Sequence, residues 1–267
     1  MKLRYLYAVG LGGVAMLSGG EKVSEQQDFE SLLKADWQVR LDDARTGDWH
    51  DHWMLDGVHA TLRNDESGMH FQAGPEIGDY AHHAGLWTKQ SFKGDVRIDY
   101  EYTRTDDTIR NVTILYVQAM GSGEGPHTKD IAEWNELRVV PAMKTYFNNM
   151  NTYHVSYAAF GTKNDVAEED SIRSWRDMPR LKKGLTGTEL KPDYSRTGLF
   201  APGVPHQMTV IRRGRDLYME IRNDEQAYLC HWNNDTLPEI TEGRIGLRHM
   251  YSRGARYQNF RVAVLRE

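Results

Sequence analysis

Short segments rich in β-branched and aromatic residues recur along the chain, separated by clusters of turn-forming residues. Within 95–102 the apolar residues occupy every second position and charged residues stand between them. Such alternation places one side of a strand in the core and the other in solvent. Comparable segments cover 68–73, 95–102, 112–119, 153–160, 207–211, 217–221, 244–248 and 257–265. Many short alternating strands predict an all-β fold in which two antiparallel sheets pack as a sandwich.

Two stretches interrupt this pattern. Residues 127–151 predict one or two short helices, broken at Pro141. Residues 162–198 are charged and turn-rich, without a sustained apolar period, and we interpret them as loops that border a cleft. Trp175 and Tyr194 support this interpretation, because large aromatic residues are unusual in a loop that only contacts solvent.

The first twenty residues follow a different pattern. Lys2 and Arg4 precede an apolar run, 6–17, that ends in small residues and is too short to cross a bilayer of about 30 Å. This arrangement predicts an export signal at 1–20, with a plain N-terminal helix as the alternative. We therefore expect an exported protein, periplasmic or outer-membrane associated in a Gram-negative bacterium. Gly20 stands where a bacterial lipoprotein has its lipidated cysteine, so either the chain is not lipidated or that cysteine was replaced.

A linker and a short helix are expected at 21–36. Residues 24–27 read Ser-Glu-Gln-Gln, which is a capping-box pattern for a helix start. Phe29 and Leu32 follow at helical spacing. From there we expect one β domain over 37–267, since an all-β unit of this length is commonly a single domain.

Composition narrows the classes of protein. The chain has 267 residues, a formal net charge of −5, 10% aromatic residues and a mean hydropathy of −0.68. These values exclude an integral membrane protein beyond the export signal, and they give no basic field for nucleic acid. An acidic ligand would therefore need locally placed arginines. A single cysteine, Cys230, excludes an internal disulfide and is expected to be a small buried residue.

Four clusters of polar and aromatic residues fall on the predicted strands. In the first, 82–89, an extended backbone puts His83 and Trp87 on one face. An edge strand with exposed polar residues would give the same pattern. In the second, Tyr116 and Gln118 project together from a strand otherwise built of Val, Ile and Leu. A buried tyrosine with a satisfied hydroxyl is the structural alternative.

The third cluster places His154 and Ser156 on one face of a strand and Tyr157 on the opposite face. Both faces can line one cleft only if a bulge or the end of the strand turns one side chain. The fourth alternates Arg244 and Arg248 with apolar residues, so one face is cationic. Surface arginines in salt bridges are the alternative there. We predict that the polar residues of all four clusters converge on one cleft.

The chain resembles the YesU-like family of bacterial proteins, long labelled a domain of unknown function, in four motifs. These are Trp-Thr-Lys after His83, the strand 116–118, Tyr-His-Val-Ser-Tyr-Ala-Ala-Phe at 153–160 and Gly-Arg-Ile-Gly-Leu-Arg at 243–248. The resemblance runs from about residue 37 to the C-terminus. It implies a concanavalin-like β-jelly roll whose concave face binds carbohydrate, associated with acidic, rhamnose-containing polysaccharides such as rhamnogalacturonan and ulvan. The family offers no catalytic signature to transfer.

The first functional hypothesis is β-elimination on a uronate-containing glycan, by a polysaccharide lyase or an oligosaccharide dehydratase. This chemistry needs a neutralised carboxylate, a base for the C5 proton and an acid for the leaving oxygen. We predict His83 or His154 as base and Tyr116 or Tyr157 as acid, with His83 and Tyr116 favoured. The residues assigned to substrate binding are Trp87, Gln118, Arg138, Tyr157, Arg173, Arg248 and His249.

Two other functions remain open. A non-catalytic lectin-like module would stack sugars on aromatic residues and hold sulfate or uronate with arginine; the candidate platforms are Trp87, Trp134, Trp175 and Tyr157. A glycoside hydrolase would need two facing carboxylates, and no matched pair is evident. Jelly rolls of this kind often hold a structural calcium, but no Asp-rich loop has suitable spacing. We assign no metal residue and no cofactor, and expect an acidic oligosaccharide or polysaccharide as partner.

Overall fold

The computed structural model describes residues 19–161, 169–179 and 184–266. These residues form two compact units that divide between Lys34 and Ala35. Apart from its last two residues, the predicted export signal lies outside the described part of the chain. No helix in the described ranges combines the length and the apolar character needed to cross a membrane.

The first unit contributes helix α1 (Gly19–Leu33). Ser24 lies inside this helix, so the prediction that the capping-box pattern marks the helix start is wrong. The residues before Ser24 include Glu21 and Lys22, which favour a helical backbone, and the helix extends through them to Gly19.

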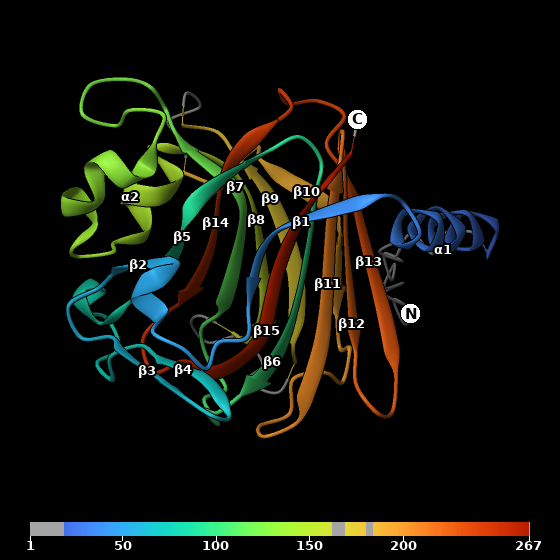
Figure 1. Cartoon of the computed structure of the whole chain (residues 1–267). Helices are drawn as coiled ribbons and strands as arrows, with labels where there is room; N and C mark the ends of the chain where they lie inside the picture. Colours follow the sequence, from blue (N-terminus) through green and yellow to red (C-terminus); the bar gives the residue numbers. More distant parts are fainter. Residues whose placement is uncertain (1–18, 162–168, 180–183, 267) are drawn as a thin grey trace, which may run out of the picture. The chain divides into compact units, whose positions relative to one another are not determined.

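The second unit contains two antiparallel sheets, which confirms the all-β jelly-roll prediction (Figure 1). The eight-stranded sheet has the order β13-β12-β11-β6-β15-β4-β3, with β1 also paired to β15. Its strands are β1 (Trp37–Asp43), β3 (Thr61–Asp65), β4 (Gly68–Gln72), β6 (Val96–Arg104), β11 (Pro205–Arg213), β12 (Asp216–Arg222), β13 (Ala227–Asn233) and β15 (Gly254–Leu265).

The seven-stranded sheet has the order β10-β9-β8-β7-β14-β5-β2. Its strands are β2 (Trp53–Asp56), β5 (Ala84–Lys93), β7 (Thr113–Gly121), β8 (Met150–Ala159), β9 (Ser171–Asp177), β10 (Glu189–Ser195) and β14 (Glu242–His249). Every segment predicted from alternation is therefore a strand. The interpretation of 162–198 as loops is wrong in part, because β9 and β10 lie within it.

The main core fills the space between the two sheets. The apolar side of β6, expected from alternation, is buried there, from Val96 to Tyr102. Leu115 and Val117 of β7 and Val155 of β8 meet it from the other sheet. The residues between them along β7 and β8 consequently face the opposite side of the seven-stranded sheet.

Short helices lie between the strands, including η1 (Trp49–Asp51) and η2 (Tyr80–His82). The one or two helices expected within 127–151 are present as two, η3 (Ile131–Arg138) and α2 (Met143–Phe147), on either side of Pro141. Figure 1 shows α2 beside the seven-stranded sheet, on the side away from the eight-stranded sheet.

Candidate functional site

Two rows of side chains cross the outer face of the seven-stranded sheet, the face turned away from the main core. Directly opposed residues of antiparallel strands share a face, so the strand register defines each row. One row comprises Trp87, Gly246, Tyr116, His154 and Trp175. The neighbouring row comprises Gly85, Arg248, Ile114, Ser156 and Arg173. Residues from all four sequence clusters therefore meet on one face.

Gly246 leaves the space in which the first row packs. A Cβ at this position would lie 2.4 Å from the Trp87 ring, closer than van der Waals contact allows. Without it, the Trp87 indole stacks on the Tyr116 ring with centroids 5.1 Å apart and planes 23° apart. The glycine thus permits an aromatic layer that a larger residue would break.

Residues 131–147, which include η3 and α2, form a strap over the β5 end of this face. The strap is fastened to Asp56, whose buried carboxylate accepts four hydrogen bonds. The donors are Trp87 Nε1 at 2.7 Å, Arg138 Nε at 2.7 Å, Asn135 Nδ2 at 2.8 Å and Tyr146 Oη at 2.9 Å. Burial raises the pKa of Asp56, and the Arg138 guanidinium opposes that rise. A charged acceptor with four donors holds the strap strongly.

Two residues predicted to bind substrate belong to this fastening. Trp87 and Arg138 are both fully buried, and each is bonded to Asp56. The Arg138 guanidinium also lies over the Trp134 ring, 4.5 Å from its centroid. Neither side chain is exposed or lines the cleft, so the structure does not bring these two residues to the candidate site, and their role in substrate binding stays a prediction.

A cleft of about 680 Å³ opens beside the strap, over β7, β8 and β9. Its polar lining includes His154, Ser156 and Arg173, and its apolar lining includes Trp175 and Met143. Arg173 is half-exposed, and its Nε lies 3.6 Å from the Asp193 carboxylate. The cleft therefore offers an aromatic surface, an imidazole and a cation within one opening, partly bordered by residues of 162–198 as predicted.

His154 stands between two aromatic rings in this cleft. Its ring centroid lies 4.8 Å from that of Trp175 and 5.3 Å from that of Tyr116. Its Nδ1 is 3.4 Å from the carboxylate of Asp177, which is almost fully buried. The two groups are close without a hydrogen bond, and a carboxylate beside Nδ1 favours the tautomer in which Nδ1 carries the proton and Nε2 can accept one.

Tyr116 lies behind His154 and is fully buried. Burial raises the pKa of its hydroxyl, which has no hydrogen-bond partner. A hydroxyl with a raised pKa remains protonated at neutral pH and can serve as a donor or a general acid. The structural alternative was a buried tyrosine whose hydroxyl forms a hydrogen bond, and the Tyr116 hydroxyl forms none.

His83 lies next to Arg248 at the edge of the strap. The Arg248 Nη2 donates to His83 Nδ1 at 2.6 Å and also to the carbonyl of Pro141. Burial and the adjacent guanidinium lower the pKa of His83 to about 3. The expectation that His83 is a base poised near neutral pH is therefore wrong, because its acceptor nitrogen is already used by a permanent cation.

Three predicted site residues lie away from the cleft. A bulge after Val117 gives Gln118 a φ of 55° and turns its side chain toward Arg212, whose Nε donates to it at 2.8 Å. Tyr157 is buried between the sheets. His249 is also fully buried, with Nε2 2.8 Å from the Tyr257 hydroxyl. Strand phase excludes Tyr157 and His249 from the outer face, so these predictions are wrong.

Asp177 and Asp56 are the important residues that sequence reasoning missed. Asp177 lies beside His154 on the neighbouring strand. Asp56 accepts hydrogen bonds from residues that are 31 to 90 positions away in the sequence. The sequence around each contains no motif that marks it. The carboxylates considered for hydrolysis, Glu101, Asp130, Glu133 and Glu136, do not line the cleft.

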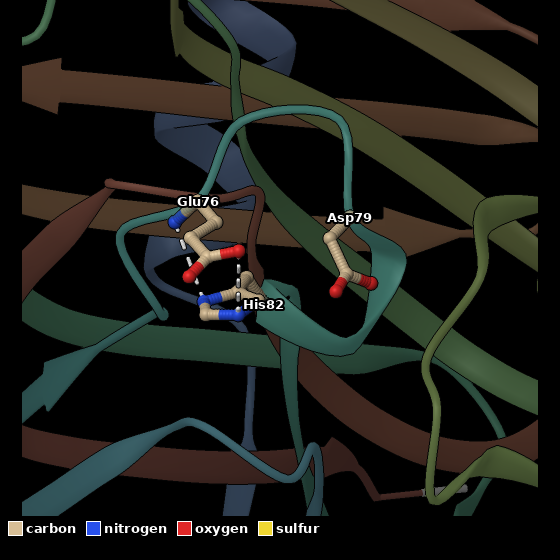
Figure 2. Close-up of side chains that lie close together, drawn as sticks. All are labelled: Glu76, Asp79 and His82. Atoms are coloured by element: carbon tan, nitrogen blue, oxygen red, sulfur yellow. Dashed lines mark hydrogen bonds and ion pairs between the residues drawn. The ribbon is translucent and has the colours of Figure 1, made fainter.

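Glu76, Asp79 and His82 form a separate cluster, with ligand atoms within 4.8 Å of one another (Figure 2). The Glu76 backbone N–H donates to His82 Nδ1 at 3.3 Å, which leaves the ring proton on Nε2. That nitrogen points toward the Glu76 carboxylate, 3.8 Å away. The Nδ1 contact holds the His82 ring within the loop, whereas the distance from Nε2 to the carboxylate is longer than a hydrogen bond.

No protein-family model matches the chain, and no curated protein sequence matches it. Solved structures do match its fold. One is a Bacillus subtilis protein of unknown function with a galectin-like fold, with a TM-score of 0.59 and 17% identity over 86% of this chain and 98% of that one. Another is the legume lectin-like domain from Entamoeba histolytica, with a TM-score of 0.54 and 9% identity over 85% and 97% of the two chains.

A third similar structure is the exoplasmic/lumenal domain of VIP36 in a form bound to Ca²⁺ and Man3GlcNAc. Its TM-score is 0.53, with 11% identity over 86% of this chain and 91% of that one. At these identities the likeness defines the fold alone. The second unit is a jelly roll of the galectin and legume-lectin type.

Proposed function

We propose that the protein binds an acidic oligosaccharide in the cleft over β7, β8 and β9. The observation that carries this proposal is the placement of Trp175, His154 and Arg173 in one opening of about 680 Å³. An aromatic ring can stack on the apolar face of a sugar, and arginine can hold a carboxylate or sulfate. The volume lies in the range of small-ligand sites.

The similar structures support this proposal through their fold. VIP36 is described with a bound Man3GlcNAc, and the lectin UEA-II is described in complex with galactose. The likeness of the four sequence motifs to the YesU-like family adds an acidic, rhamnose-containing polysaccharide as the proposed source of the ligand. Export from the cytoplasm would give the protein access to that polysaccharide.

A second candidate function, β-elimination, is favoured by the pairing of His154 with Asp177. In this reaction His154 Nε2 removes the C5 proton of a uronate, the C4–O bond breaks as a C4–C5 double bond forms, and Tyr116 protonates the departing oxygen. The centroid separation of 5.3 Å between the two rings supports a shared site. This pair combines a face-sharing geometry with an imidazole that lines the cleft, which His83 does not.

One experiment tests both functions. Calorimetric titration with ulvan and rhamnogalacturonan oligosaccharides measures binding, while absorbance of unsaturated uronate and mass spectrometry for loss of water measure elimination. We expect Trp175→Ala to weaken binding about 10-fold or more, as for loss of a buried aromatic contact. Trp49→Ala, at a tryptophan that does not line the cleft, is the matched control. If neither oligosaccharide binds the wild type, the proposed function is wrong.

A further inference from the structure

Arg248 is a fully buried cation whose hydrogen bonds are incomplete. Its Nη2 donates to His83 and to the Pro141 carbonyl, but its Nε and Nη1 are buried without a partner. Leaving a charged donor buried and unpaired is costly, because the group has lost its hydration without gaining an acceptor. Such an atom marks a place where an acceptor belongs.

The Tyr116 hydroxyl is a second unpartnered donor in the same place. Both side chains contact the Tyr146 ring of the strap, since the Arg248 guanidinium lies 4.2 Å from its centroid and the Tyr116 ring stacks on it at 6.0 Å. We call Arg248 and Tyr116, with their buried unpartnered polar atoms, the inner donor pair. It presents N–H and O–H donors, so an acceptor-rich anionic group would complement it.

The inner donor pair is adjacent to residues that line the cleft. Ile114, which lines the cleft, is the residue opposite Arg248 in the pairing of β7 with β14. Met250 lines the cleft two positions after Arg248. Met143, another lining residue, belongs to the strap that covers Arg248. Arg248 and Tyr116 are fully buried and do not line the cleft, so a ligand group would reach them only if lining side chains such as Met143 moved.

We infer that Arg248 and Tyr116 form an inner subsite for one anionic group of the bound glycan, a carboxylate or a sulfate. His83 is the positioning residue that aims the guanidinium. This inference rests on the proposed function of the cleft. It adds to that function the residues that contact the anionic group of the ligand.

The role of His83 follows from its contacts. Its Nδ1 must accept, because arginine has no lone pair to offer, so the ring is neutral with the proton on Nε2. The Tyr251 and Tyr80 rings pack against it, with centroids 4.3 and 5.5 Å away. The imidazole is therefore fixed and keeps Nη2 engaged, which leaves Nε and Nη1 for the ligand.

The test compares affinities for oligosaccharides that differ only in charge. Titration calorimetry is run with ulvan and rhamnogalacturonan oligosaccharides before and after carboxyl reduction, and with ulvan oligosaccharides after desulfation. The two treatments separate a carboxylate from a sulfate as the recognised group. We expect the wild type to prefer the charged form by roughly 10- to 100-fold, the worth of hydrogen bonds to a charged group.

Arg248→Gln should reduce this preference roughly 10-fold while leaving affinity for the neutral form within about twofold; Arg173 in the cleft accounts for any preference that remains. Tyr116→Phe, which keeps the ring stack, should reduce the preference roughly 3- to 10-fold. His83→Ala should reduce it as well, and His83→Asn should restore it, because its side-chain oxygen replaces the Nδ1 acceptor. Arg261→Gln, at an exposed arginine paired with Asp42 on the other sheet, is the matched control.

The outcomes separate the two proposals. Failure of the wild type to bind any oligosaccharide would overturn both the proposed function and the inner subsite. Equal affinity for charged and neutral forms, or an unchanged preference in both Arg248→Gln and Tyr116→Phe, would overturn the inner subsite alone. Thermal unfolding of each variant tests whether it is folded. If Arg248→Gln does not fold, the Tyr116→Phe result decides whether the inner subsite exists. A preference that is constant from pH 5.5 to 8 supports a neutral His83; a titration in that range would overturn its assigned role.

Discussion

Gly246→Ala should destabilise the protein through a single methyl group. The new Cβ would lie 2.4 to 2.8 Å from three atoms of the Trp87 ring. That ring has little freedom to retreat, because it is fully buried, stacked on Tyr116 and bonded through Nε1 to Asp56. Overpacking of this kind costs about 1–3 kcal/mol. For a domain of this size, each kcal/mol lowers Tm by about 2–4 °C.

Differential scanning calorimetry measures this effect, with Gly47→Ala as the matched control. A Cβ on Gly47 meets no atom within 4 Å, so the same substitution should leave Tm nearly unchanged there. Tryptophan fluorescence should also change in Gly246→Ala as the indole moves against Tyr116. If both variants melt with the wild type, the aromatic layer is not packed as described and the reasoning fails.

Three other predictions concern charge. Asp56→Asn leaves the buried Arg138 without its counter-ion, so it should cost about 3–5 kcal/mol and speed amide exchange in the strap; unchanged exchange would contradict the fastening role. The pKa values of His83 and His249 are lowered to about 3, so the unfolded chain binds more protons below about pH 6.5. Stability in urea should therefore fall between about pH 6.5 and 3, by up to about 1.4 kcal/mol per pH unit for each histidine, and a flat profile would refute this. On any substrate that is turned over, His154→Ala should lower turnover roughly 100-fold with binding nearly intact, and full activity would exclude it as the base.

Alternation predicted the sheets because burial of one face imposes a period of two wherever the inward residues are apolar. The sequence pattern did not predict β9 as a strand, because two of its inward residues, Ser174 and Arg176, are polar and only Ile172 beside them is apolar. Arg176 is tolerated there because it donates to the carbonyls of Pro238 and Asp177, neither of which could be anticipated from local sequence. A strand whose buried polar side chains are satisfied by backbone carbonyls has no hydrophobic period in its sequence.

The residues of the candidate site were predicted in part, wherever strand phase alone decides which face a side chain occupies. Strand phase correctly put His154 with Ser156 and set Tyr157 apart from them, since phase is a local property. Gln118 was misplaced because a bulge reverses the phase within its own strand. The burial of the candidate residues was predicted less well than their strand phase. The sequence marked Arg248 as a candidate, but it did not show that the strap would cover this side chain.

The position of β14 in the seven-stranded sheet has a consequence for biosynthesis. β5 and β7 are made early, yet they are not neighbours, because β14 lies between them and belongs to residues 242–249. A nascent chain therefore cannot bring Trp87 and Tyr116 against Gly246, which lies between them, until residues 242–249 have been synthesised. Ligand-binding competence should appear abruptly during synthesis, only after this late strand has been inserted. A chain interrupted before that point would lack the middle of its own site, whatever else had already folded.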